Sequence, residues 1–340
     1  MTATVSVLKI VFKQFISKLF LVGACAKNDG DRYRRLIDPI GHLPEMNRRS
    51  TLTKGPPMTD IKEKTARFEG SDGTSLFYRN YIAEIERFQV VISHGLGEHS
   101  GRYGHVVDAL CPMGASLWIH DHRGHGRSQG KRGHVNDFDA YVQDLKMLMA
   151  LARTDKSDQL PLLLLGHSMG GLIALSFVRQ YPRHVDGLIV SSPLLGVPKP
   201  PSPVLKAVAR IMSVIWPALS FDNRLDPSFI SHDGDEVRAY EQSEQVHSRI
   251  SARWFTRCMS EIEKTGGSPE AITSPILMQI AGEDHLVSTP AATAYFNALT
   301  VADRTLFHYE TLYHEIYNEK RPDRERVLAD LKEWVAARYL

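Results

Sequence analysis

The sequence predicts an α/β fold: a mostly parallel central sheet flanked by helices, with a helical cap inserted into the chain. Three observations predict this fold class. Apolar runs typical of buried parallel strands recur at 89–93, 115–119, 162–165 and 275–281, with helical patterns between them. The third run leads directly into a Gly-x-Ser-x-Gly turn. Before the fourth run, prolines and amphipathic helical patterns interrupt the alternation of strands and helices.

Length and charge fit this organisation. The 340 residues suffice for one large α/β core, predicted at 58–194 and 273–340, and for a cap at 195–272. Lysine and arginine number 41 against 39 acidic residues, so the nearly neutral chain gives no indication of nucleic-acid binding. The three cysteines are scattered and predict neither a metal site nor a disulfide framework. No cofactor is expected.

Residues 1–57 form an N-terminal extension for which three interpretations stay open. A predicted helix has apolar residues on one face and basic and polar residues on the other, which suits the surface of an anionic membrane. Alternatively, Cys25 ends a lipoprotein-like processing sequence and carries a lipid, although Lys18 interrupts the apolar region. In the third interpretation, translation begins at Met58. The expected location is accordingly the cytoplasm or the membrane surface.

The first strand expected to carry chemistry, 89–93, runs into the glycine-rich segment His94-Gly-Leu-Gly-Glu-His99. Where a Gly-x-Ser-x-Gly turn follows later in the chain, a His-Gly loop after an early strand gives one backbone N–H to an oxyanion hole. Here that donor is the N–H of Leu96. Two such donors aimed at a developing oxyanion change the rate by orders of magnitude. A tight turn without catalytic function is the alternative for these glycines.

The strand 162–165 is followed at once by Gly166-His-Ser-Met-Gly170 and a helical pattern, the arrangement of a nucleophile elbow. The turn is so tight that Gly166 and Gly170 must lack side chains, and its central residue takes strained backbone angles. This geometry lifts the Ser168 hydroxyl clear of the sheet and directs the first N–H groups of the following helix, that of Met169 among them, at a developing oxyanion. An ordinary strand-to-helix turn is the alternative, but it predicts no catalytic partners further along the chain.

Two later loops supply the base and the acid that a serine nucleophile needs. Asp284 follows the strand that begins after the cap, although its neighbour Glu283 is a rival acid. His314 follows the strand-like run 304–309. Open α/β sheets place their active sites at the carboxyl ends of strands, and the order along the chain is nucleophile, acid, histidine. Ser168, Asp284 and His314 are therefore the predicted catalytic triad.

The histidine-rich segment 120–125 is a candidate metal site. His120 and His122 have a spacing that could chelate zinc. Zinc needs three or four convergent ligands, and Gly124 and Gly126 indicate turn geometry instead. We expect a structural loop here and no metal.

Three segments together resemble the monoacylglycerol lipase and lysophospholipase family of serine α/β-hydrolases. They are His94-Gly-Leu-Gly-Glu-His-Ser-Gly-Arg-Tyr103, His120-Asp-His-Arg-Gly-His-Gly-Arg-Ser128 and Gly166-His-Ser-Met-Gly-Gly171, and the cap segment Ile250-Ser-Ala-Arg-Trp-Phe255 is similar as well. The resemblance implies an α/β-hydrolase fold without a cofactor, hydrolysis of single-chain acyl esters, and the same triad and oxyanion donors. It also implies that Glu98 and Arg102 help to hold a polar head group such as glycerol. The resemblance places Tyr317 at the position where the mammalian monoacylglycerol lipase has a histidine near the glycerol site, so Tyr317 is a further candidate for substrate binding.

The expected function is hydrolysis of monoacylglycerol to fatty acid and glycerol through an acyl-enzyme. A lysophospholipase or a short-chain carboxylesterase is the alternative enzyme, and a hydrolase-fold protein that binds a ligand with little turnover is the alternative of another class. The apolar face of the predicted cap helix at 204–216 either packs on the core or contacts an acyl chain or a membrane surface. Peripheral membrane contact through this helix and the N-terminal helix is a further expectation.

Overall fold

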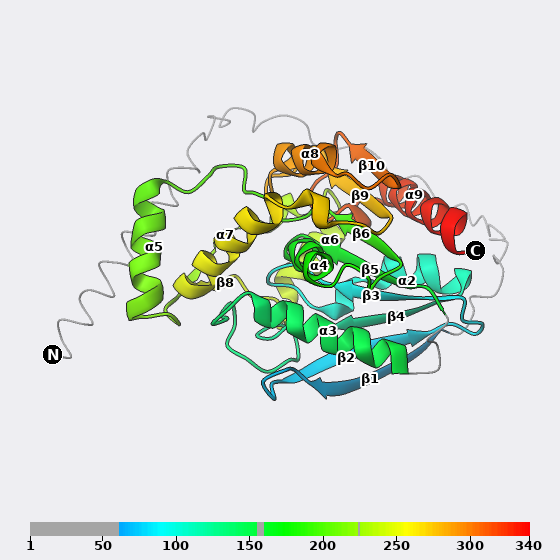
Figure 1. Ribbon diagram of the computed structural model, residues 1–340, viewed down its shortest axis with the longest axis horizontal. Helices are drawn as coiled ribbons and strands as arrows, with labels where there is room; N and C mark the ends of the chain where they lie inside the picture. Colours follow the sequence, from blue (N-terminus) through cyan, green and yellow to red (C-terminus); the bar gives the residue numbers. More distant parts are fainter. Residues whose placement is uncertain (1–60, 155–159, 224) are drawn as a thin grey trace, which may run out of the picture. The chain divides into compact units, whose positions relative to one another are not determined.

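The computed structural model describes residues 61–154, 160–223 and 225–340 (Figure 1). The predicted N-terminal extension, with its amphipathic helix and Cys25, lies outside these residues. Within them, no helix combines the length and the apolar composition needed to span a bilayer. Cys111 and Cys258 are buried free thiols.

The central sheet has eight strands in the described part of the chain: β1 (Lys62–Glu69), β2 (Ser75–Ile82), β3 (Phe88–Ser93), β4 (Ala115–His120), β5 (Leu162–His167), β6 (Gly187–Ser191), β9 (Ile276–Ala281) and β10 (Arg304–Tyr309). Their spatial order is β1–β2–β4–β3–β5–β6–β9–β10. β2 runs antiparallel to both of its neighbours, and every other neighbouring pair is parallel. The predicted mostly parallel sheet is confirmed, with an antiparallel edge that the apolar runs did not indicate.

Helices cover both faces of this sheet, and its central strands β3 and β5 are therefore buried on both sides (Figure 1). One face carries α3 (Asp139–Thr154), α4 (Met169–Gln180) and α8 (Thr289–Ala298), and the other carries α2 (Gly104–Leu110) and α9 (Arg321–Tyr339). Side chains alternate along β5, so Leu162 and Leu164 pack with the first group of helices, whereas Leu163 and Leu165 pack with the second. A continuous apolar run in the sequence therefore contributes to two cores.

Between β6 and β9 the chain leaves the sheet and forms a mostly helical segment with a small two-stranded antiparallel sheet. Its elements are α5 (Pro203–Ile215), β7 (Ser220–Asp222), α6 (Gly234–Gln242), β8 (Arg249–Ser251) and α7 (Ala252–Gly266). Ser202 and Ser251 cap α5 and α7 by accepting backbone N–H groups of the first turn. α7 contacts α4 through the buried hydrogen bond from Ser176 to Glu261, and α5 packs against α7 (Figure 1). Short 3-10 helices lie at Ser100–Arg102, Cys111–Met113, Pro227–Phe229, Pro269–Ala271 and Ile316–Asn318.

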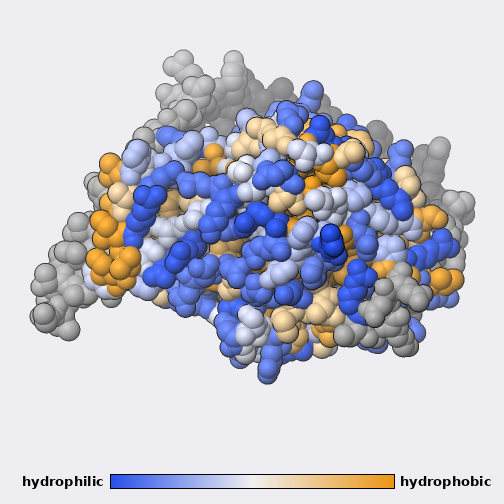
Figure 2. Space-filling model, viewed as in Figure 1, coloured by the Kyte–Doolittle hydropathy of each residue, from blue (hydrophilic) through white to orange (hydrophobic). Residues whose placement is uncertain are grey.

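The outer face of α5 is largely uncovered in the part of the chain that the structure describes. Val204, Ile211, Val214 and Ile215 expose 59, 57, 77 and 56% of their surface, whereas Met212 is buried. Figure 2 shows apolar surface gathered where α5 lies in Figure 1. Within the described residues, most of this face therefore does not pack on the core. Contact of this face with an acyl chain or a membrane surface stays a prediction.

Candidate active site

Three of the predicted site residues follow the carboxyl ends of parallel strands. Ser168 follows β5, Asp284 lies in the turn after β9, and His314 lies in the loop after β10. Because these strands are parallel and separated only by β6, their ends lie at one edge of the sheet. All three residues are withdrawn from solvent: Ser168 is 9% exposed, and the side chains of His314 and Asp284 are 5 and 1% exposed.

Ser168 stands on a strained turn between β5 and α4. Its φ of 54° and ψ of −119° lie outside the regions that non-glycine residues favour. The Ser168 N–H donates to the carbonyl oxygen of Ser191, and the Leu194 N–H donates to that of Ser168, each at 3.0 Å. The Ser168 side chain does not cap α4, so its hydroxyl is not occupied in that way.

Two glycines allow this turn to pack. A Cβ on Gly166 would overlap the carbonyl oxygen of Gly170, and a Cβ on Gly170 would overlap the carbonyl oxygen of Ser93 at the end of β3. Neither overlap can be relieved by a side-chain rotation, because the obstructing atoms belong to the backbone. The structure thus supplies a steric reason for both predicted elbow glycines.

The glycine-rich loop after β3 lies directly against the serine turn. A Cβ on Gly95 would be 3.3 Å from the Cβ of Ser168, so the backbone of this loop passes beside the serine. Leu96 follows Gly95 in the same loop. Met169 is the first residue of α4, and the first N–H groups of a helix have no intrahelical partner. The two predicted oxyanion donors therefore belong to the residues next to Gly95 and next to Ser168.

Asp284, and not Glu283, contacts the histidine. His314 Nδ1 lies 2.7 Å from Asp284 Oδ2, and Asp284 Oδ1 accepts the N–H groups of Leu286 and Val287 at 2.8 and 2.9 Å. The side chain of Glu283 is exposed. Burial alone would raise the pKa of Asp284, but His314 and the two N–H groups hold that pKa below its ordinary value.

The electrostatic surroundings of His314 favour its charged form. Burial lowers the pKa of His314, but Asp284, followed by Glu315 and Glu98, outweighs burial and raises that pKa above its ordinary value of 6.5. The imidazole centroid lies 4.7 Å from that of His167, the residue before Ser168. Among the described residues no hydrogen bond joins Ser168 Oγ to His314, and such bonds are often long until substrate binds.

A buried chain of ion pairs connects the loop after β3 to the loop that carries His314. Glu98 accepts the N–H of Gly95, and its Oε2 lies 3.4 Å from Nε of Arg102. Arg102 in turn donates to Glu315, the residue after His314. The three charged side chains expose 5 to 7% of their surface. Burial disfavours the charged guanidinium, but Glu315 and Glu98 raise the pKa of Arg102 above its ordinary value.

The structure brings Glu98 and Arg102 together, as expected for two residues of one site. Both also have partners within the protein, the backbone N–H of Gly95 for Glu98 and the carboxylate of Glu315 for Arg102. The Arg102 guanidinium lies over the ring of Tyr240, 4.9 Å from its centroid. Tyr317 has a different partner: it is buried in the core with residues of α2 and α9, and its hydroxyl donates to Gln279 at 2.7 Å. A head-group role for these residues stays a prediction.

The histidines at the end of β4 and directly after it form a buried cluster beside the loop that follows β3. The ring centroids of His120 and His122 are 4.5 Å apart, and the backbone N–H of His122 donates to His94 Nε2 at 2.9 Å. Burial lowers the pKa of His120 to about 3 and that of His122 well below its ordinary value, so both are neutral at physiological pH. Within the described ranges, no group of three or more His, Cys, Asp or Glu side chains is arranged to hold a metal ion.

Comparisons with known proteins identify the family. The family described as Serine aminopeptidase, S33 matches residues 85–321. A monoacylglycerol lipase of Mycolicibacterium smegmatis is 32% identical over 272 residues, which cover 79% of this chain and 96% of the relative. Phospholipase YtpA of Bacillus subtilis is 33% identical over 241 residues, which cover 70% of this chain and 91% of the relative. The crystal structure of a monoacylglycerol lipase from Paleococcus ferrophilus matches with a TM-score of 0.69 at 30% identity, covering 82% of this chain and 100% of that chain.

These matches confirm the α/β-hydrolase fold and the resemblance inferred from the motifs. The matched segment includes the loop after β3, the serine turn and the loops after β9 and β10. Together with the lipase and phospholipase relatives, it makes the chain a carboxylic ester hydrolase. The chain belongs to the Serine aminopeptidase, S33 family of α/β-hydrolases, in which it is similar to monoacylglycerol lipases.

Proposed function

We propose that the chain hydrolyses monoacylglycerols, with Ser168 as nucleophile, His314 as general base and Asp284 as the residue that orients the imidazole. The observation that carries this proposal is the buried hydrogen bond of 2.7 Å between Asp284 and His314, at the sheet edge that also carries the strained serine turn. With its Nδ1–H donated to Asp284, the neutral imidazole has a free lone pair on Nε2, which can accept the serine proton.

The reaction proceeds in two halves. As Ser168 Oγ attacks the ester carbonyl, its proton passes to His314 Nε2, and the carboxylate of Asp284 stabilises the imidazolium. The N–H groups of Leu96 and Met169 stabilise the negative charge on the carbonyl oxygen. His314 then gives the proton to the departing glycerol oxygen, which leaves an acyl group on Ser168. Water attacks this acyl-enzyme with the same proton transfers and releases the fatty acid.

The proposed substrate class is supported by two relatives and by the surface chemistry of the cap. The relatives from M. smegmatis and P. ferrophilus are named monoacylglycerol lipases. An ester with one long acyl chain partitions into bilayers and micelles, so an enzyme that cleaves it benefits from an apolar approach. We assign this role to the exposed face of α5, within a cap at 195–272 between core segments 58–194 and 273–340. Glu98 and Arg102 are the candidates for contact with the glycerol head group.

A second candidate function is hydrolysis of a single-chain phospholipid. The relative from B. subtilis is named a phospholipase, and at 33% identity it is as similar in sequence as the lipase from M. smegmatis at 32%. The chemistry at Ser168 would be the same for both substrates, and only the departing alcohol would differ.

The test compares fatty-acid release from monooleoylglycerol and from lysophosphatidylcholine by the wild type and by Ser168→Ala. Loss of the nucleophile should lower turnover by about 10⁴-fold or more. Ser228→Ala, at an exposed position in the cap, is the matched control and should retain wild-type turnover. Release mainly from the phospholipid would favour the second candidate. Release from neither substrate, together with failure of a fluorophosphonate to label the wild type, would contradict both candidates.

A further inference from the structure

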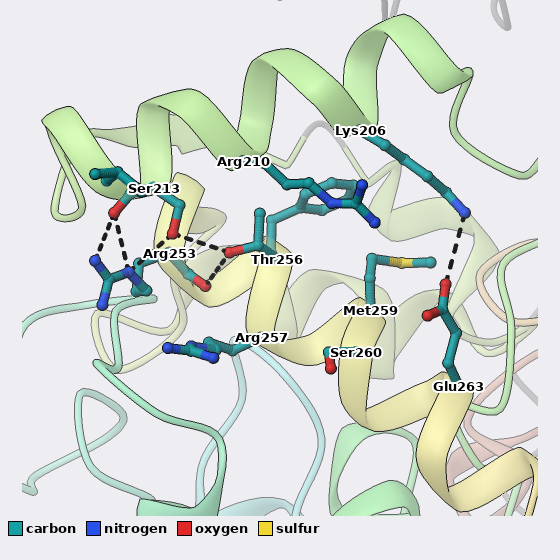
Figure 3. Close-up of a pocket in the computed structure, with 11 residues that line it drawn as sticks. Lys206, Arg210, Ser213, Arg253, Thr256, Arg257, Met259, Ser260 and Glu263 are labelled. Carbon is teal, nitrogen blue, oxygen red and sulfur yellow. Dashed lines mark hydrogen bonds and ion pairs between the residues drawn. The ribbon is translucent and has the colours of Figure 1, made fainter.

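A groove of about 370 Å³ lies between α5 and α7 (Figure 3). Four of the residues that line it are basic and one is acidic. The basic residues are Lys206, Arg210, Arg253 and Arg257, and the acidic residue is Glu263. Because the whole chain has 41 basic and 39 acidic residues, this excess of positive charge is a local property of the groove.

The carboxylates near the groove neutralise it only weakly. Lys206 Nζ lies 3.8 Å from Glu263, and Arg257 Nε lies 3.8 Å from Asp137, with all four side chains at least one-third exposed. Ion pairs of this length between exposed side chains contribute little. Arg210 forms no hydrogen bond or ion pair with any residue that the structure describes. The groove therefore presents positive charge that the described residues neutralise only in part.

The basic side chains are also placed close to one another. Lys206 and Arg210 stand at i and i+4 on α5, where like charges repel. Figure 3 shows both side chains extending from α5 toward α7. Arg253, on α7, is held in place by donating to the carbonyl and hydroxyl oxygens of Ser213 at 2.6 to 3.0 Å. An anion in the groove would relieve the repulsion on α5.

The exposed apolar face of α5 borders this groove. Val214 belongs to both features, because it lines the groove and is 77% exposed. It follows Arg210 by four residues and therefore lies on the same side of the helix, so the charged and apolar surfaces of α5 meet at Val214. A cationic stripe beside an apolar stripe is typical of a helix at a lipid surface, where the apolar side chains enter the acyl region and the cations meet anionic head groups.

We propose that the α5–α7 groove binds the phosphate of an anionic glycerophospholipid head group while the apolar face of α5 enters the same leaflet. A nucleic acid or a free anion would leave the neighbouring apolar face in water, whereas a lipid surface covers both features. This inference rests on the proposed action on lipid esters. It names anionic glycerophospholipids as the lipids that the cap binds in the bilayer where those esters are dissolved.

The test is sedimentation of the full-length protein with vesicles of ether-linked phosphatidylcholine, with and without ether-linked phosphatidylglycerol. Ether lipids have no acyl ester, so the enzyme leaves the vesicles intact. The wild type should prefer the vesicles with phosphatidylglycerol, and the preference should vanish near 1 M salt, where the Debye length is about 3 Å. Lys206→Gln combined with Arg210→Gln should weaken this binding by about tenfold or more, because each basic side chain near an anionic membrane contributes roughly a factor of five.

The matched control combines Arg183→Gln, in the loop after α4, with Lys332→Gln on α9; both positions are exposed. It removes the same charge and should bind as the wild type does. Equal losses in the two double variants would indicate general electrostatic attraction and overturn the proposal. Undiminished binding of the Lys206/Arg210 variant would also overturn it, because the groove would then be unused or filled by another part of the chain. Binding of inorganic phosphate without any vesicle preference would overturn the lipid head group as the occupant.

Hydrolysis of the water-soluble ester p-nitrophenyl butyrate separates this inference from the proposed function. Lys206 and Arg210 lie outside the triad and the loop after β3, so both double variants should hydrolyse this ester at the wild-type rate. Hydrolysis without vesicle preference would overturn only the head-group site. Vesicle preference without hydrolysis in the wild type would overturn the proposed function and support the site.

Discussion

The candidate active site at the carboxyl ends of β5, β9 and β10, here called the strand-end site, pairs its charged side chains within the protein, whereas the α5–α7 groove leaves much of its charge unpaired among the described residues. At the strand ends, Asp284 is buried against His314, and Arg102 is buried between two carboxylates. On the cap, Arg210 is exposed and has no partner among the described residues. Since leaving a buried charge unpaired costs about 3–5 kcal/mol, the first region has to be complete within the chain. An exposed charge carries no such requirement, so the second region can accept its partner from outside.

The largest effect that would test this contrast is expected at Asp284. Asp284→Asn keeps the size of the side chain, but its amide can donate to His314 Nδ1 and so favour the wrong tautomer. By comparison with the same change in a serine protease, kcat for monoacylglycerol should fall by about 10³- to 10⁴-fold. Glu283→Gln, at the neighbouring exposed position, is the control and should leave kcat unchanged. Equal losses in both variants would contradict the choice of acid.

A second comparison concerns two glycines, one in the serine turn and one at the end of α7. Gly170→Ala should lower the free energy of unfolding by about 3 kcal/mol or more, because the new Cβ would overlap the carbonyl oxygen of Ser93. Gly266, the last residue of α7, has no atom within 4 Å of an added Cβ. Gly266→Ala should therefore change stability by no more than about 1 kcal/mol, and in the stabilising direction. Urea unfolding followed by circular dichroism measures both, and similar losses would contradict the tight packing of the serine turn.

Most of the strand-end site was predictable because each of its residues belongs to a local pattern. An apolar strand and a Gly-x-Ser-x-Gly turn locate Ser168, and the order of later strands locates His314. The choice between Asp284 and Glu283 was not predictable, since it depends on which carboxylate faces the histidine in three dimensions. Glu315 was missed because its partner Arg102 is 213 residues away in the sequence. No local pattern links two residues so far apart.

The edge of the sheet and the cap were harder to predict, for a related reason. β1 is almost entirely exposed, so it has no apolar run of the kind that indicates a buried strand. The periodicity of α5 indicated a helix, but it could not show whether the apolar face is covered, because that depends on which neighbours reach it. The groove also requires α7, which begins 37 residues after α5 ends.

The ion-pair chain of the strand-end site is expected to set the pH dependence of activity. His314 must be neutral to accept the serine proton, so activity should fall as the pH drops through its raised pKa. Glu315 contributes to raising that pKa, and Glu315→Gln should therefore move the acid limb of kcat/KM to lower pH. The exposed Glu310→Gln is the control and should leave the limb in place. Normalising each profile to its own maximum separates this shift from any loss of stability caused by leaving Arg102 without one partner. An acid limb that moves to higher pH would contradict the proposed effect of the Glu98–Arg102–Glu315 ion pairs on the pKa of His314.

The smallest effect on stability is expected on the outer face of α5. Val214 is 77% exposed, so Val214→Ser should change the free energy of unfolding by less than about 0.5 kcal/mol while weakening sedimentation with vesicles. Leu205, on the same helix, is 6% exposed, and Leu205→Ala should cost about 2–5 kcal/mol. Urea unfolding of the full-length chain compares the two. If Val214→Ser lowered the free energy of unfolding as much as Leu205→Ala, another part of the chain would have to cover the exposed apolar face of α5. The α5 surface would then belong to the protein's interior, like the strand-end site, and could not serve as a surface for lipid.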